Sequence, residues 1–168
     1  LLLRAVQGQM ARIWGLPAGL GWGGTKAKQP EAQAAYENTL GLVLELMAGA
    51  DFLFGAGLLD SVQIMSLEEL VIADEVFGMA TRLVRGVTVD RETLAVDLIK
   101  KLGFRGDYLF ERHTRAHVSD LWRARLGEAG TYEAWQNAGS PRLEDKARAA
   151  ADHILASPAP EFPEALGR

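Results

Sequence analysis

The chain has 168 residues, of which 48% are hydrophobic and 24% charged, a composition typical of a single globular domain. Its formal net charge of -4 gives no support for a nucleic-acid surface, and its basic residues are spread out apart from an Arg-rich patch at 112–125. No apolar run approaches the roughly 20 residues of a membrane span. The absence of cysteine excludes disulfides and thiolate metal sites, and it fits a cytoplasmic protein.

The chain begins with the pattern of a helix followed by a weak strand. Residues 1–14 carry apolar side chains at helical spacing, and Gly15 and Pro17 end the pattern. Residues 16–22 are a strand candidate, and a loop over 23–28 follows. Because the first residues already lie inside a helical pattern, without Met or a capping residue, we expect the chain to be part of a longer protein.

A helix ends the first strand–loop–helix unit, and a short apolar strand opens the second. Pro30 suits the first turn of a helix that runs to about Ala48, and Gly49 ends it. The strand over 51–54 contains Phe52-Leu53-Phe54, a wholly apolar run that predicts burial on both faces of a parallel sheet.

A glycine-rich loop and another capped helix follow this strand. The loop over 55–65 contains Gly55 and Gly57, which allow tight turns and close approach of a ligand. Ser66-Leu67-Glu68-Glu69 reads as a capping box that opens a helix to Arg85. Since two strand–loop–helix units in succession indicate parallel strands, we predict that the loops 22–28 and 55–61 lie side by side.

The remaining residues indicate helices without a convincing strand. Asp90 and Thr131 are capping residues, and Pro141 suits a helix start. We predict helices over 91–102, 107–126, 132–138 and 142–156. The chain thus divides into βα units at 1–86, a helical extension at 87–156 and a tail at 157–168 that we expect to fray. Two βα units cannot close a barrel, so a larger parent protein is expected.

An ordered series of segments resembles the trimethylamine methyltransferase family. No single motif is specific, but the series covers nearly the whole chain with few gaps. It comprises Gly24-Thr25 through Gln33-Ala34-Ala35 to Glu37, Gly49-Ala50 through Gly57 to Asp60-Ser61, Ser66-Leu67-Glu68 through Asp74-Glu75 to Gly78-Met79, Arg85-Gly86, Glu92-Thr93-Leu94-Ala95, His113-Thr114, His117, and Tyr132-Glu133-Ala134-Trp135.

The resemblance implies a fold, a reaction and partners. The fold would be the C-terminal part of a (β/α)8 TIM barrel, its last two βα units, followed by an all-helical C-terminal extension. The full-length protein would transfer a methyl group from a quaternary or tertiary amine to the cobalt of a separate corrinoid protein. No cofactor would be bound directly, because the corrinoid is carried by the partner. The piece alone is expected to be inactive, and a homo-oligomer stays open. All residues are standard, as in the branch without pyrrolysine.

The candidate site lies in the two loops after the strands. Cation recognition favours aromatic faces and carboxylates. The substrate-binding candidates are Trp22, Gly24, Thr25, Lys26, Phe54, Gly55, Gly57 and Asp60. Relatives often have Asp at the position of Lys26 and His-Asp at the positions of Phe54 and Gly55, so the substrate is expected to be a betaine rather than trimethylamine. The catalytic residues stay unassigned.

Each candidate also has a structural interpretation. Trp22 and Phe54 can be core side chains, and Asp60 can cap its own loop. Lys26 and Lys28 lie beside a glycine pair, but the spacing is not that of a phosphate-binding P-loop. His113 and His117 share a helix face in His-Thr-Arg-Ala-His, which lacks the Glu of a zinc motif, so no metal site is predicted. A rival function is a non-catalytic binding or assembly module that docks through its helical half.

Overall fold

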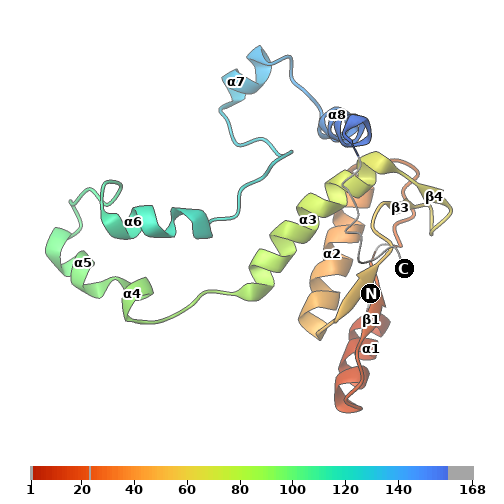
Figure 1. The fold of residues 1–168 in the computed structure, drawn as a ribbon, viewed down its shortest axis with the longest axis horizontal. Helices are drawn as coiled ribbons and strands as arrows, with labels where there is room; N and C mark the ends of the chain where they lie inside the picture. Colours follow the sequence, from red (N-terminus) through yellow and green to blue (C-terminus); the bar gives the residue numbers. More distant parts are fainter. Residues whose placement is uncertain (1, 23, 159–168) are drawn as a thin grey trace.

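The computed structural model describes residues 2–22 and 24–158 and shows helices packed on a short parallel strand pair (Figure 1). The N-terminal part runs, in order, α1 (Leu2–Ile13), β1 (Gly19–Gly21), α2 (Ala32–Ala48), β2 (Phe52–Phe54), β3 (Leu58–Leu59), β4 (Ile64–Met65) and α3 (Leu67–Arg85). This order confirms the predicted helices and strands of the first half. The β3–β4 hairpin was not predicted, and α2 begins two residues after Pro30.

The two strands pair in parallel and are covered by helices on one face. Leu20 lies opposite Leu53, flanked by Gly19 with Phe52 and by Gly21 with Phe54. Leu20 is 1% exposed and Leu53 packs on the helical core, whereas Phe52 and Phe54 are 65% and 54% exposed. The prediction that the strand is buried on both faces is therefore wrong for this chain. Alternate residues of a strand point to opposite faces, and helices cover the Leu53 face.

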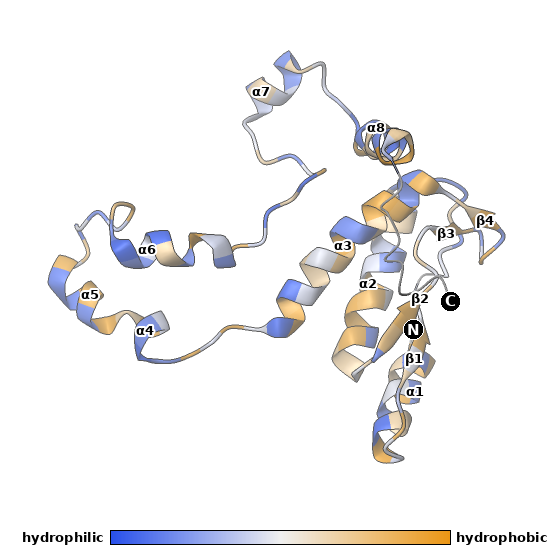
Figure 2. Ribbon diagram, in the orientation of Figure 1, coloured by the Kyte–Doolittle hydropathy of each residue, from blue (hydrophilic) through white to orange (hydrophobic). Residues whose placement is uncertain are grey.

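The core lies between the strands, α2 and α3. Its buried residues are Trp22, Leu42, Ala73 and Ala80, and Leu53 and Val76 pack against them. Figure 2 shows apolar residues along β2 and α2, in orange. Helix α1 packs closely on the end of α2 and on β1. A Cβ added to Gly8 of α1 would lie 3.1 Å from Ala48 Cβ and 3.3 Å from Leu20 Cδ1.

Local chemistry sets the helix ends. Gly49 takes a left-handed conformation (φ 87°) at the end of α2, where its N–H and that of Ala50 bond to carbonyls of the last turn. Ser66 caps α3 by accepting from Glu69 N at 3.1 Å. In a complete capping box the Glu69 carboxylate would also accept from Ser66 N. Here Ser66 N donates to Gly57 O, and the Glu69 carboxylate accepts from Asn38 of α2.

The second half forms an arm that leaves α3 and returns to it (Figure 1). Its elements are α4 (Arg91–Leu94), α5 (Val96–Leu102), α6 (Arg112–His117), the 3-10 turn η1 (Val118–Asp120), α7 (Tyr132–Asn137) and α8 (Leu143–Ala156). Within the described residues 87–158 there is no strand, as predicted. α8 packs beside the start of α3, where Arg148 Nε donates to Glu68 Oε1 at 3.0 Å.

Two helix predictions in this arm need correction. The helix expected over 91–102 is interrupted at Ala95, which has a φ of 47°. The stretch 107–126 is helical only over 112–120, because polar side chains bond to the backbone before it. Thr114 Oγ1 donates to Tyr108 O, and Asp107 Oδ1 accepts from Leu109 N. The caps Asp90 and Thr131 are confirmed. Residues 159–168 of the predicted frayed tail lie outside the described part of the chain.

We expect the isolated 168-residue chain to be poorly stable. Large apolar side chains stay exposed on the open sheet face and on α1, among them Phe52, Phe54, Leu2 and Leu3. The free energy of unfolding should therefore be below about 5 kcal/mol, the lower end for complete domains. Urea unfolding measures it, and a steep single transition with a midpoint typical of complete domains would contradict the expectation.

Candidate functional site

The loops that follow β1 and β2 are joined to each other by three contacts. Asp60 N donates to Ala27 O and Ser61 N to Thr25 O, both at 2.9 Å. Lys28 Nζ lies 2.7 Å from Asp60 Oδ1. This confirms the prediction that the two loops lie side by side at the carboxyl end of the strands, where α/β proteins place their ligands.

The first loop is anchored to α2 by a hydrogen bond to Glu37. Lys26 N donates to Glu37 Oε2 at 2.9 Å, and Thr25 Oγ1 accepts from Ala27 N at 3.0 Å. Hydrogen bonds from the Thr25 side chain and then from the Lys26 amide lower the pKa of the Glu37 carboxyl. Thr25 is 1% exposed. Its side chain therefore serves the loop, while the Lys26 side chain stays in solvent.

The second loop depends on two glycines in left-handed conformations. Gly55 has a φ of 97°, and a Cβ there would lie 2.6 Å from Trp22 O. Gly57 has a φ of 80°, is buried, and accepts a hydrogen bond from Ser66 N at 2.9 Å. Both positions exclude a side chain. The turn continues through Asp60, Ser61 and Val62, which all have positive φ.

The aromatic candidates separate into one core residue and one exposed residue. Trp22 is 8% exposed and its ring lies 6.2 Å from that of Phe77, so it packs in the core rather than facing a ligand. Phe54 is exposed and stacks on Phe52, with ring centroids 6.1 Å apart. Phe54 can therefore offer an aromatic face on the open side of the sheet.

The polar candidates also differ in what they can contact. Lys26 and Gly24 are exposed, and a Cβ at Gly24 would lie 3.0 Å from Arg4 Nη2. The Asp60 carboxylate forms an ion pair with Lys28, which joins the two loops. This ion pair offsets the negative charge that Asp60 could offer to a cationic ligand. The first-loop residue Gly23 lies outside the described residues.

Sequence reasoning missed the buried polar side chains on α2 and α3. Glu45 is 1% exposed and pairs with Arg4 Nη1 at 2.9 Å, and Arg4 also donates to Gly21 O. Asn38 is 6% and Glu69 2% exposed. Burial raises the pKa of Glu45, against the opposing effect of Arg4. A signal existed: Asn38 and Glu45 stand at helical spacing with Leu42 on the buried face of α2.

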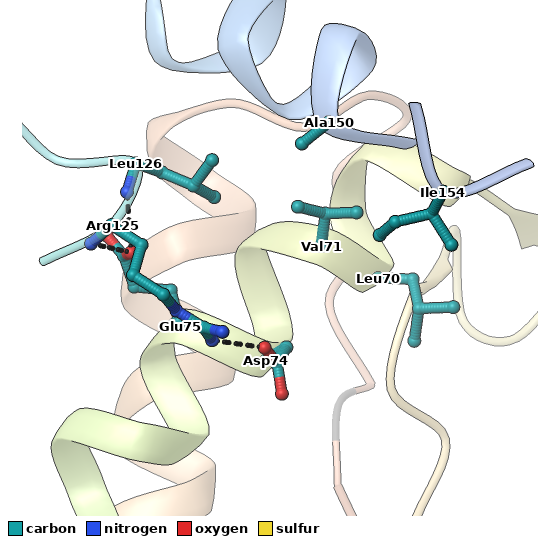
Figure 3. Close-up of a pocket in the computed structure, with 8 residues that line it drawn as sticks. All are labelled: Leu70, Val71, Asp74, Glu75, Arg125, Leu126, Ala150 and Ile154. Atoms are coloured by element: carbon teal, nitrogen blue, oxygen red, sulfur yellow. Dashed lines mark hydrogen bonds and ion pairs between the residues drawn. The ribbon is translucent and has the colours of Figure 1, made fainter. Parts of the chain in front are cut away.

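A cavity lies elsewhere, between α3, α8 and the returning chain at 125–126. Its volume is about 530 Å³, and its lining residues are Leu70, Val71, Asp74, Glu75, Arg125, Leu126, Ala150 and Ile154 (Figure 3). Asp74 pairs with Arg125, and Glu75 accepts from the backbone N–H groups of 125, 126 and 127 at 2.6–2.9 Å. These carboxylates anchor the returning chain, and the cavity contains none of the predicted site residues.

The histidines of α6, His113 and His117, have structural contacts. The His113 ring donates to Glu92 O at 2.8 Å, and His117 Nδ1 lies 2.8 Å from Asp120 Oδ2. Across residues 2–22 and 24–158, no group of three or more His, Asp or Glu is placed to hold a metal ion. In the same residues, no helix has the length and apolar character needed to span a membrane.

Comparison with known proteins identifies similar sequences along almost all of the chain. Residues 1–167 match the family model described as Trimethylamine methyltransferase (MTTB). Trimethylamine methyltransferase MttB of Methanosarcina barkeri is 32% identical over 154 residues, which cover 92% of this chain and 31% of that protein. Glycine betaine methyltransferase of Desulfitobacterium hafniense (strain Y51) is 34% identical over 163 residues, covering 95% and 33%. The chain spans about a third of the length of these curated relatives.

Proposed function

The chain belongs to the trimethylamine methyltransferase family, and on this premise we propose that the full-length protein transfers a methyl group from a quaternary or tertiary amine to the cobalt of a corrinoid protein. The observation that carries the proposal is the family match over residues 1–167, together with the two loops joined at the carboxyl end of β1 and β2. The corrinoid is a substrate here, because the separate protein carries it to the site.

A (β/α)8 barrel is the architecture in which this chain fits best. The parallel pair β1–β2 has helices on one face, as barrel strands do, and an open face bearing Phe52 and Phe54. In a barrel that open face would point to the interior and the joined loops would lie at the catalytic end. We therefore propose that this chain contributes the last two βα units and the helical extension.

The proposed substrate is a betaine, which combines a methylated cation with a carboxylate. The exposed ring of Phe54 can face the methylated nitrogen, since aromatic faces attract cations. The exposed ammonium of Lys26 can pair with the carboxylate, which trimethylamine lacks. On transfer the C–N bond breaks, its electron pair stays with the departing amine, and the methyl passes to reduced cobalt, which contributes the pair for the new bond. Trp22 and Asp60 serve the core and the loop junction.

The test is methyl transfer by the full-length enzyme with Lys26→Ala. We expect kcat/KM for glycine betaine to fall severalfold, mainly through KM, because the carboxylate that pairs with Lys26 is present only in the betaine. Activity with trimethylamine should be unchanged or higher. The matched control is Lys100→Ala, an exposed lysine on α5. An equal loss with both substrates would contradict the carboxylate contact.

A further inference from the structure

A buried polar contact joins α2 to α3 and has no part in the methyl transfer described above. Asn38 Nδ2 donates to Glu69 Oε1 at 2.7 Å, and the two residues are 6% and 2% exposed. Asn38 Oδ1 is buried without a hydrogen-bond partner in the described part of the chain. Burial raises the pKa of Glu69, opposed by the hydrogen bond from Asn38. Such a contact is a poor source of stability compared with apolar packing.

Both members of the contact stand beside the residues that hold the candidate loops. Asn38 follows Glu37, which accepts from the Lys26 amide of the first loop. On α3, Glu69 N donates to Ser66 Oγ, and Ser66 N donates to Gly57 O of the second loop. The Asn38–Glu69 bond therefore closes a ring that runs from one loop through α2 and α3 to the other loop.

The rest of the buried α2–α3 contact is apolar. Its buried residues include Leu42, Ala73 and Ala80, whose apolar contacts are non-directional. A buried hydrogen bond is directional, so it fixes the relative position of the two helices at the end that carries the loops.

We propose that Asn38 and Glu69 form a positioning pair that sets the spacing of the loops 24–28 and 55–61, and through it the contacts that Lys26 and Phe54 make with the substrate. The pair touches neither the substrate nor the reacting atoms. The statement about substrate contacts rests on the proposed function, whereas the statement about loop spacing stands on the geometry alone.

The test uses three variants of the full-length protein. Asn38→Leu/Glu69→Leu replaces the bond by apolar packing, and Glu69→Gln keeps an acceptor for Asn38. Glu133→Gln is the control, because Glu133 is exposed on α7. Hydrogen exchange of peptides covering residues 55–61 reports the Asp60 and Ser61 amides, which bond to the first loop. This measurement needs no activity, so it separates the positioning role from the proposed reaction.

We expect the double-leucine variant to keep its melting temperature, to exchange the 55–61 amides about tenfold faster, and to raise KM for the betaine about tenfold with a smaller change in kcat. Glu69→Gln and Glu133→Gln should stay within about twofold of the unchanged protein in both measurements. Unchanged exchange in the double-leucine variant would overturn the proposal. Failure of the double-leucine variant to fold would also overturn it, because the pair would then be a stabilising contact. Equal effects of Glu69→Gln and the double-leucine variant would overturn it as well.

Discussion

Arg4→Ala should destabilise the 168-residue chain by about 3 kcal/mol at pH 7, the scale of removing one partner of a buried ion pair. Glu45 is 1% exposed and Arg4, a third exposed, is its ion-pair partner at 2.9 Å. The substitution leaves a buried carboxylate without this cation. It also removes the bond to Gly21 O, next to the first loop. Urea unfolding measures the loss, which should appear as a large unfolded fraction because the starting stability is low.

The effect of Arg4→Ala should depend on pH. Burial already raises the pKa of Glu45, and Arg4 opposes the rise. A carboxyl with a raised folded-state pKa binds more protons in the folded chain, so stability falls as pH rises from its ordinary pKa through the folded value. Without Arg4 the folded-state pKa of Glu45 is higher still, so the loss of stability continues to higher pH. The destabilisation should therefore be largest at neutral pH and smallest near pH 4.

A double variant separates charge from packing. Arg4→Ala/Glu45→Gln removes the buried charge together with its partner, and it should recover most of the stability lost at pH 7 and lose the pH dependence. Arg91→Ala is the matched control, because Arg91 and Asp97 pair at the surface with 91% and 74% exposure. Its effect should be near zero. A pH-independent loss in Arg4→Ala, or none, would contradict the role of the pair.

Gly57→Ala should cost about 2–4 kcal/mol, because a left-handed backbone and a close contact combine at this position. A Cβ at Gly57 would lie 2.9 Å from Leu70 Cβ and 3.1 Å from Ser66 O. Both atoms lie at the start of α3, so relieving the contact requires a shift of that end of the helix. The expected result is a lower urea midpoint for the variant. In the full-length enzyme we expect a higher KM, since the second loop must shift.

Gly15→Ala is the control for the cost of placing a side chain on a left-handed backbone. Gly15 has a φ of 66°, but an added Cβ would meet nothing within 4 Å. This variant should lose only the conformational cost, about 1 kcal/mol. If Gly57→Ala were no worse than Gly15→Ala, the close packing of the second loop on α3 would be contradicted.

Local patterns predicted the order of elements in the first half and the pairing of the loops. Apolar spacing located α1, α2 and α3, and the apolar run located β2. Two strand–helix units in succession imply parallel strands, and that topology brings the loops 22–28 and 55–61 together. These inferences depend on neighbouring residues and on chain connectivity, both of which a single sequence contains.

The predictions that were wrong or incomplete involve contacts between distant segments or a turn without the usual sequence signal. A short apolar run has the same sequence pattern whether one or both faces of its strand are covered. The exposure of Phe52 and Phe54 could therefore not be predicted from it. The β3–β4 hairpin turns through Asp60, Ser61 and Val62 at positive φ, where the usual turn signal of Asn-Gly or Asp-Gly is missing. Within the site, the pairing of Asn38 with Glu69 depends on the register of two helices.

Methyl transfer to cobalt by the full-length enzyme tests the central claim most directly. Reduced corrinoid protein is mixed with enzyme and glycine betaine or trimethylamine, and the cobalt absorption spectrum is followed with time. We predict that cobalt is methylated with glycine betaine and much more slowly with trimethylamine. Methylation with trimethylamine but with no betaine would contradict the assigned substrate. Absence of methylation with every quaternary and tertiary amine would contradict the proposed reaction itself.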